Sequence, residues 1–220
     1  INKNKSDKKE STCRIGRTYQ DFITYKEANK TEYYVEMDTV EGIKGHSVLL
    51  TLCFIPLNFM LALKLNNQTI SEVTDKINSI KQILGFEMFH KMFPVILTDN
   101  GKEFKRPDLI EDNGNNVVNT KVFFCDSRRS DQKGSIEVTH EYIRKYIEQG
   151  KDLDSYSQEQ INLMMNHINN TKRKKLNGNT PFNLMVNKFG IENINKLGFH
   201  YIEPNKIILN SSIFKNDNNK

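Results

Sequence analysis

Residues 94–104 read Pro-Val-Ile-Leu-Thr-Asp-Asn-Gly-Lys-Glu-Phe, and this stretch decides the fold. Val95, Ile96 and Leu97 are consecutive apolar residues without polar alternation, which is typical of a strand buried on both faces of an α/β sheet. Open α/β sheets bind ligands beyond the carboxyl ends of their strands, and Asp99 stands at such an end. Asp-Asn-Gly is also ordinary turn sequence, so the rest of the chain has to decide between the two interpretations.

Length, composition and charge limit the classes of protein to which the chain can belong. The chain has 220 residues, 37% of them hydrophobic, and a mean hydropathy of −0.62, which is enough for one well-buried domain. No apolar run approaches the ~20 residues of a membrane helix, and the first residues carry no signal-peptide pattern. Because the chain begins with isoleucine, we expect a fragment or a processed product. Three scattered cysteines, Cys13, Cys53 and Cys125, form no CxxC pair and indicate a reducing, cytosolic compartment. The net charge of +5 permits a polyanionic partner without requiring one.

The patterns around this stretch predict three antiparallel strands, a helix, two further strands and then helices. We expect the strands at 33–40, 47–54, 59–65, 95–98 and 122–125, and helices at 19–28, 70–84, 134–147 and 157–170 and after Thr180-Pro181. The box Thr69-Ile-Ser-Glu72 predicts the start of the second helix, and Gly85 predicts its end. We expect a short aromatic turn at 86–93, a hairpin turn at Asp112-Asn113-Gly114 and a frayed end at 210–220.

This order fits an α/β fold of the RNase H-like type, a mixed five-stranded sheet flanked by helices. We expect a flexible basic arm or linker at 1–31, the catalytic core at 32–170, and a basic linker with a C-terminal helical extension at 171–220. Asp38 and Asp99 would then meet at the mouth of the sheet, and Glu137 could reach them from the first turn of a later helix. Two strand carboxylates and one helix carboxylate suit a pair of Mg²⁺ ions, which prefer oxygen ligands. Two such ions ~3.5–4 Å apart can activate the attacking oxygen and stabilise the leaving oxygen of a phosphodiester.

Four segments in this order resemble the catalytic domain of DDE transposases, close to the insertion-sequence-thirty family in the integrase superfamily. They are Glu36-Met-Asp-Thr-Val-Glu-Gly, Phe93-Pro-Val-Ile-Leu-Thr-Asp-Asn-Gly-Lys-Glu-Phe, Gln132-Lys-Gly-Ser-Ile-Glu-Val-Thr-His-Glu-Tyr-Ile-Arg and Leu176-Asn-Gly-Asn-Thr-Pro. The resemblance extends from about residue 15 to about residue 209.

The resemblance implies an RNase H-like core in which Asp38, Asp99 and Glu137 form a metal-binding catalytic triad. It implies Mg²⁺ as the cofactor, with Mn²⁺ as a substitute. It further implies cleavage at transposon ends, which frees a 3′-hydroxyl, and attack of that hydroxyl on target DNA. The implied partners are the terminal repeats, target DNA and further copies of the chain, in the bacterial cytoplasm and on the nucleoid when DNA is bound.

The sequence departs from the family pattern at two places. Ser127-Arg-Arg-Ser-Asp131 stands where family members carry a Pro-Tyr-Ser-Ser-aromatic run after the aspartate that matches Asp126, and Thr139 replaces an asparagine. The helix-turn-helix region that normally precedes this domain is also missing from the sequence. A catalytically silent remnant that binds DNA or self-associates is therefore the alternative function, and a nuclease such as an RNase H is a third.

Basic residues supply candidate contacts to DNA phosphates. They are Lys102, Arg128, Arg129, Lys133, Arg144, Lys172, Arg173, Lys174 and Lys175. Arg128 and Arg129 are favoured because they lie between the second and third triad residues. A run such as 172–175 is also compatible with an ordinary solvated surface.

Each acidic candidate has a plainer interpretation. Asp38 could be a solvated strand charge, Glu137 shares a helix stripe with Glu141 and Arg144, and Asp126 ends a strand as Asp99 does, as a decoy or a substitute ligand. Glu137-x-x-His140 and Glu87-x-x-His90 imitate a carboxylate-bridged di-iron site, which would need four long helices instead of strands. We expect surface or packing roles for the remaining histidines, His46, His90, His167 and His200.

Overall fold

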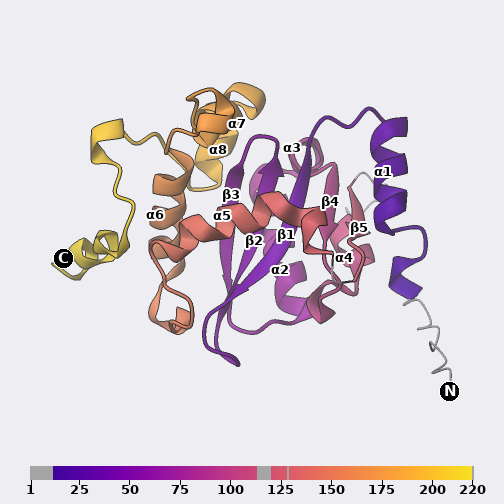
Figure 1. Ribbon diagram of the computed structural model, residues 1–220, viewed down its shortest axis with the longest axis horizontal. Coiled ribbons are helices and arrows are strands. Elements are labelled where there is room, and N and C mark those ends of the chain that lie inside the picture. Colours follow the sequence, from indigo (N-terminus) through magenta and orange to yellow (C-terminus); the bar gives the residue numbers. More distant parts are fainter. Residues whose placement is uncertain (1–11, 113–119, 128, 220) are drawn as a thin grey trace, which may run out of the picture.

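The computed structural model describes residues 12–112, 120–127 and 129–219 and contains one five-stranded sheet (Figure 1). The strand order is β3-β2-β1-β4-β5. The strands are β1 (Tyr34–Glu41), β2 (Val48–Ile55), β3 (Phe59–Leu65), β4 (Val95–Thr98) and β5 (Lys121–Phe124). Strands β1, β2 and β3 form an antiparallel meander, whereas β4 and β5 run parallel to β1. The predicted mixed five-stranded, RNase H-like sheet is thereby confirmed.

Strand β4 lies inside the sheet, as its apolar run predicts. All four of its residues are buried. Its register against β1 pairs Glu36 with Leu97 and Met37 with Thr98. The residue that follows each member of the second pair is an aspartate, Asp38 or Asp99, so the register brings the two aspartates side by side where β4 ends and β1 continues.

Helices cover the sheet and both of its sides. They are α1 (Tyr19–Ala28), α2 (Ile70–Leu84), α3 (Phe86–Met92), α4 (Pro107–Glu111), α5 (Gly134–Arg144), α6 (Gln158–Asn169), α7 (Pro181–Phe189) and α8 (Ile191–Lys196). Figure 1 shows α5 crossing one face of the sheet, α1 beside β5, and α6 with α7 and α8 on the side of β3. Among these helices and the rest of the described chain, no helix is long and apolar enough to cross a membrane.

The ends of α2 follow the sequence signals in part. The Thr69 hydroxyl accepts a hydrogen bond from the Glu72 backbone N–H at 3.3 Å. The Glu72 carboxylate, however, accepts from the backbone N–H groups of Asn66 and Asn67, so only one half of the predicted capping box forms. Gly85 ends the helix with φ of 77°, as predicted.

Three sequence predictions need correction. The expected aromatic turn at 86–93 is the helix α3, because Gly85 redirects the chain and lets Phe89 and Met92 bury one face of a new helical segment. The expected frayed end at 210–220 packs as far as Phe214, where Ile213 is buried in the core and the ring of Phe214 lies against that of Tyr156. Strands β4 and β5 are parallel and cannot be joined by a tight hairpin turn. Of the turn residues 112–114, positions 113 and 114 lie outside the described residues.

The segment after residue 170 contributes to the same core as the sheet. Phe182, Met185, Ile194 and Phe199 are buried in the main hydrophobic cluster, and the Phe199 ring lies 4.8 Å from that of Phe59. The proposed division of the chain into 1–31, 32–170 and 171–220 stays a prediction. The packing shows that residues beyond 170 help to bury β3.

Polar groups from other elements cover both outer strands. On β3, the Asn169 amide accepts from the Met60 backbone N–H at 3.0 Å and donates to its carbonyl at 2.8 Å. Gln158, three helical turns earlier on α6, bonds the Lys64 N–H and the Ala62 carbonyl in the same way. These amides replace the missing neighbouring strand.

On β5, the N–H of Val122 donates to the Glu111 carboxylate at 2.9 Å, and the N–H of Phe124 donates to the Arg17 carbonyl at 2.8 Å. Arg17 also pairs with Glu111 through its guanidinium at 2.6 Å. The α1 and α4 regions therefore satisfy this outer strand much as α6 satisfies β3.

Candidate active site

The three predicted triad residues line one hollow of about 370 Å³, which we call the triad hollow. Asp38 comes from β1, Asp99 follows β4, and Glu137 lies in the first turn of α5. The other lining residues are Asn100, Gly101, Cys125, Asp126, Ser127, Arg129 and Lys133. The fold thus brings together side chains that are up to about a hundred residues apart in the sequence.

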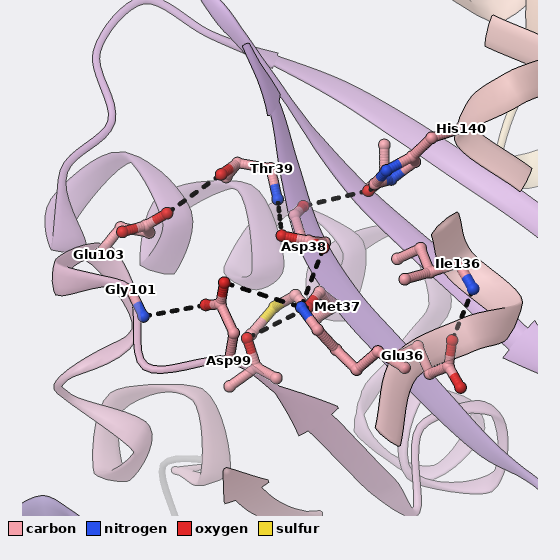
Figure 2. Close-up of polar contacts among 12 residues, drawn as sticks. Glu36, Met37, Asp38, Thr39, Asp99, Gly101, Glu103, Ile136 and His140 are labelled. Carbon is pink, nitrogen blue, oxygen red and sulfur yellow. Dashed lines mark hydrogen bonds and ion pairs between the residues drawn. The ribbon is translucent and has the colours of Figure 1, made fainter. Parts of the chain in front are cut away.

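Both aspartates are oriented by the backbone. One oxygen of Asp38, Oδ1, accepts from the Thr39 N–H at 2.8 Å, and Oδ1 of Asp99 accepts from the Gly101 N–H at 2.9 Å (Figure 2). The second oxygens, Oδ2, both face the ammonium of Lys133, at 2.9 Å from Asp38 and 3.8 Å from Asp99. One oxygen of each carboxylate is fixed, and the other is turned toward a positive charge.

Lys133 is buried although it is charged. It ends the 3₁₀ turn Ser130–Lys133 immediately before α5, and its side chain is 7% exposed. Its ammonium also lies 3.4 Å from the Met37 carbonyl and donates to it. The ammonium is therefore held by three oxygens from β1 and the end of β4.

The start of α5 is attached to β1 by a second carboxylate. Oε2 of Glu36 accepts a hydrogen bond from the Ile136 backbone N–H at 2.7 Å, one of the first-turn donors of α5 that the helix itself leaves free (Figure 2). Glu36 is 1% exposed, and this burial raises its pKa to about 7, against the opposing effect of the hydrogen bonds it accepts. Because Glu36 stands two residues before Asp38, strand β1 positions both Asp38 and the helix that carries Glu137.

A histidine supports the other side of β1. The Thr51 hydroxyl donates to the Asp38 carbonyl at 3.1 Å and lies 2.8 Å from Nε2 of His140. Burial lowers the pKa of His140 to about 4, partly opposed by the charge of Asp38, so the imidazole is neutral near pH 7. This contact ties the second turn of α5 to the strand that carries Asp38.

Thr139, one of the two departures from the family pattern, points away from the triad hollow. Its hydroxyl donates to the Ser135 carbonyl at 2.6 Å and lies 3.5 Å from the Cys53 sulfur. Thr139 is 4% exposed and packs between α5 and β2. The departure at 127–131 borders the triad hollow, which Ser127 and Arg129 line.

A second hollow of about 570 Å³ adjoins the triad hollow and shares part of its lining. Asp38, Asp99 and Gly101 line both hollows, while Glu103, His140 and Arg144 belong to the second. Oε1 of Glu103 accepts from the Thr39 hydroxyl at 3.1 Å and from the Gln68 amide at 2.6 Å.

Glu103 was not among the predicted site residues. It stands four residues after Asp99, within the stretch 94–104, and its closeness to Asp99 in the sequence is the signal that could have identified it. Through Thr39 it connects the loop after β4 to β1.

Asp126 lies with the triad and not apart from it. Its carboxylate lines the triad hollow, is 50% exposed, and accepts from the Gln132 amide at 2.9 Å. The Asp126 N–H donates to the oxygen of the same glutamine at 2.7 Å. Oδ1 of Asp126 also lies 3.8 Å from the Arg14 guanidinium. Whether Asp126 is a substitute ligand or a decoy stays a prediction.

The predicted DNA-contacting residues occupy different environments. Lys102, Arg129, Lys172, Lys174 and Lys175 are exposed. Arg144 lines the second hollow and donates to the Glu41 carbonyl at 3.0 Å. Arg173 and Lys133 are buried, and the Arg173 guanidinium stacks 3.7 Å from the Tyr142 ring. Arg128 lies outside the described residues, and contact of any of these residues with DNA stays a prediction.

The di-iron alternative does not fit. Glu87 and His90 lie on α3, which precedes β4, whereas Asp99 follows it, so they are at the opposite end of that strand from the triad. In the described part of the chain, one group of His and Asp side chains has its ligand atoms within 4.8 Å of one another: His46, Asp152 and Asp154. It is an exposed cluster in which the His46 ring nitrogen lies 3.0 Å from Asp154.

The donor set of the triad hollow fits a divalent metal ion such as Mg²⁺. Its acidic side chains offer carboxylate oxygens, which Mg²⁺ prefers. The Lys133 ammonium between Asp38 and Asp99 shows that this position accommodates a cation. The oxygens of the three triad residues do not all lie within 4.8 Å of one another, and Mg²⁺ commonly completes its shell with water.

No family model matches the chain. The chain is 34% identical over 144 residues to a protein of Spiroplasma virus SpV1-R8A2 B that is named as an integrase (ORF3), a match that covers 66% of this chain and 42% of that protein. It is 37% identical over 86 residues to the transposase for insertion sequence element IS4351 of Bacteroides fragilis (39% and 25% of the two chains). It is 38% identical over 61 residues to transposase InsI for insertion sequence element IS30A of Escherichia coli strain K12 (28% and 16%). The chain spans less than half the length of these curated relatives.

Solved structures agree with the fold. The catalytic core domain of BIV integrase superposes with a TM-score of 0.51 at 16% identity, over 70% of this chain and 93% of that domain. A simian T-cell lymphotropic virus intasome, in complex with PP2A regulatory subunit B56 gamma, gives a TM-score of 0.53 at 14% identity, over 69% and 53% of the two chains. The fold is that of an integrase catalytic core, and the resemblance to insertion-sequence transposases, IS30 among them, is confirmed.

Proposed function

We propose that this chain is the catalytic domain of a DDE transposase, which cleaves DNA and transfers the freed strand in the movement of an insertion sequence. One observation carries the proposal. Carboxylates from β1, from the end of β4 and from the first turn of α5 line a single hollow that already accommodates a positive charge. The relatedness to transposases named above supports it.

In this proposal Asp38, Asp99 and Glu137 hold Mg²⁺, with Mn²⁺ as a substitute. Such ions activate an attacking oxygen and stabilise a leaving oxygen at a phosphodiester. The chain itself supplies orientation. Backbone N–H groups fix one oxygen of each aspartate, and Glu36 fixes the helix that carries Glu137.

The two hollows that Asp38 and Asp99 both line give room for DNA beside the site. The proposed partners are transposon terminal repeats, target DNA and further copies of the chain. The exposed lysines among the predicted contacts and the net charge of +5 are suited to phosphate binding. The proposed location is the bacterial cytoplasm, with nucleoid association when DNA is bound.

The test is nicking of supercoiled plasmid in the presence of Mn²⁺ by wild type, Glu137→Gln and the control Glu141→Gln. Glu141 lies one turn further along α5, is exposed and does not line the triad hollow. Removal of one preorganised donor that stabilises a transition state costs about 10²–10³ in rate, and we take the same order for loss of a charged metal ligand. We therefore expect Glu137→Gln to lose nicking by at least about 100-fold and Glu141→Gln to keep it, with unchanged circular dichroism for both.

Nicking that survives Glu137→Gln, or that needs no metal, would refute the assignment of the triad. Absence of nicking by wild type would favour the silent remnant. Selective cleavage of the RNA strand in an RNA–DNA hybrid would favour an RNase H.

A further inference from the structure

We propose that the Lys133 ammonium is a built-in counter-ion, which occupies the cation position between Asp38 and Asp99 and competes with the divalent metal for it. The inference rests on the proposed function, in which these two aspartates are metal ligands. It assigns Lys133 a role at the metal site in place of the DNA contact expected from the sequence.

The competition between the ammonium and the metal follows from which carboxylate oxygens of Asp38 and Asp99 lack a backbone hydrogen bond. Oδ1 of Asp38 and Oδ1 of Asp99 are both engaged by backbone N–H groups. The Oδ2 atoms are left to bind a shared cation, and these are the atoms that face Lys133 at 2.9 and 3.8 Å. A metal ion held by Asp38 and Asp99 would therefore compete with the ammonium for these oxygens.

The lysine and the two aspartates differ in their exposure to solvent. The Lys133 side chain is 7% exposed, whereas those of Asp38 and Asp99 are 20% and 47% exposed. The two carboxylates are therefore more accessible to solvent than the ammonium that they face. A buried ammonium without a paired carboxylate is costly, so Lys133 keeps its position until another cation neutralises the aspartates.

Another carboxylate, that of Asp126, could pair with the displaced ammonium. Lysine carries its charge on a flexible four-carbon stem. Asp126 lines the same hollow as Lys133 with a half-exposed carboxylate. Movement toward Asp126 would keep the ammonium paired while the metal occupies its former position.

This arrangement has two effects on the protein. Without metal, the single charge of Lys133 offsets part of the repulsion between two aspartates on neighbouring strands, so the site stays assembled. With metal, the lysine raises the metal concentration that the site needs. Removal of its charge should therefore tighten metal binding and destabilise the metal-free protein.

The experiment measures Mn²⁺ affinity by electron paramagnetic resonance titration of the full chain without DNA. It compares wild type, Lys133→Met, Lys133→Arg and the control Lys91→Met. Methionine keeps an unbranched side chain without the charge. Lys91 is an exposed lysine on α3, paired with Glu87 and remote from the site. A charge within 4–6 Å changes the proton affinity of a carboxylate by about 10- to 1000-fold.

We therefore expect Lys133→Met to bind Mn²⁺ at least about tenfold more tightly, with wild-type affinity for Lys91→Met and little change for Lys133→Arg. We also expect a lower melting temperature of metal-free Lys133→Met and a larger rise on metal addition. If Lys133→Met does not fold, Lys133→Gln replaces it. Affinity equal to or weaker than that of Lys91→Met would overturn the inference.

Asp38→Asn separates this outcome from failure of the proposed function. If wild type binds Mn²⁺ and Asp38→Asn does not, the metal site stands whatever Lys133 does. If neither wild type nor Lys133→Met binds Mn²⁺, both the metal site and the competition are refuted.

Discussion

Replacement of Gly101 by alanine perturbs one contact beside the two aspartates. The backbone of Gly101 has φ of −52° and ψ of 149°, a conformation that alanine adopts without strain. The added methyl group, however, would lie 2.6 Å from Oε2 of Glu103 and 2.9 Å from its Oε1. These distances are too short for a carbon–oxygen contact, so the Glu103 carboxylate has to move.

The size of the expected destabilisation follows from the hydrogen bonds that Glu103 loses when its carboxylate moves. It is 5% exposed, and its Oε1 accepts from the Thr39 hydroxyl and the Gln68 amide. A hydrogen bond to a charged group contributes about 1.5–3 kcal/mol. Gln68 is exposed and can turn to water, so we count the loss of one such bond. Alanine offsets about 0.4–1 kcal/mol by restricting the unfolded chain. We expect a net decrease of about 1–2 kcal/mol in the free energy of unfolding.

Urea unfolding of wild type, Gly101→Ala, Glu103→Ala and the double variant tests this reasoning. Once Glu103 is truncated, the methyl group has space, and Gly101→Ala should be neutral or stabilise by about 0.4–1 kcal/mol. The two substitutions should therefore couple strongly in a double-mutant cycle. An equal loss from Gly101→Ala in both backgrounds would show that the carboxylate contact is not the cause.

Two further predictions concern stability. The pKa of His140 is lowered to about 4 from an ordinary value of 6.5, so between these values the folded protein binds fewer protons than the unfolded chain. The contribution of His140 to the free energy of unfolding is therefore fully present above pH 6.5. It is lost as the pH falls toward 4, by up to about 3 kcal/mol. Urea unfolding at pH 7 and pH 4.5 should show a smaller difference for His140→Gln than for wild type, and equal differences would contradict the assignment. Asn169→Leu should cost about 2–4 kcal/mol because both backbone groups of buried Met60 lose their partner. Thermal unfolding should show a much smaller effect for Asn193→Leu, whose amide bonds only the Phe189 carbonyl on the helix before it; similar losses would argue against the role at the edge of β3.

The part of the site carried by β4 was predictable from local sequence. An unbroken apolar run predicted a buried strand, and the strand end predicted where Asp99 would lie. Asp38 followed from the strand pattern around it, since the order of elements placed its strand beside β4. Each of these signals lies within one element, and side-chain periodicity is sufficient to detect it.

The contacts between elements that assemble the site could not be predicted from the periodicity of side chains within one element. Glu36 meets Ile136 across a separation of 100 residues, and the Lys133 ammonium reaches back to Met37 across 96. Nothing in the sequence near Glu36 distinguishes it from a strand charge in solvent. Lys133 read as a basic surface residue because lysine is rarely buried unless it is paired, and its partners come from other elements.

The helix α3 shows why short segments are difficult to assign from sequence. Seven residues rich in aromatic side chains, directly after a helix-ending glycine, resemble a turn as much as a helix. Burial of Phe89 and Met92 against the core decided between them. Tertiary packing therefore overrode a local pattern that is ambiguous at this length.

The amides and carboxylates along the outer strands fix the width of the sheet. For a second chain to add a strand at β3, the hydrogen bonds of Gln158 and Asn169 to the β3 backbone would first have to break. At β5 a second chain would meet the Glu111 carboxylate and the Arg17 carbonyl at the N–H groups it needs. Edge-to-edge growth, the usual route by which open sheets aggregate, is thereby obstructed on both sides. Any association between copies of this chain would therefore have to use helices and loops instead of the edges of the sheet.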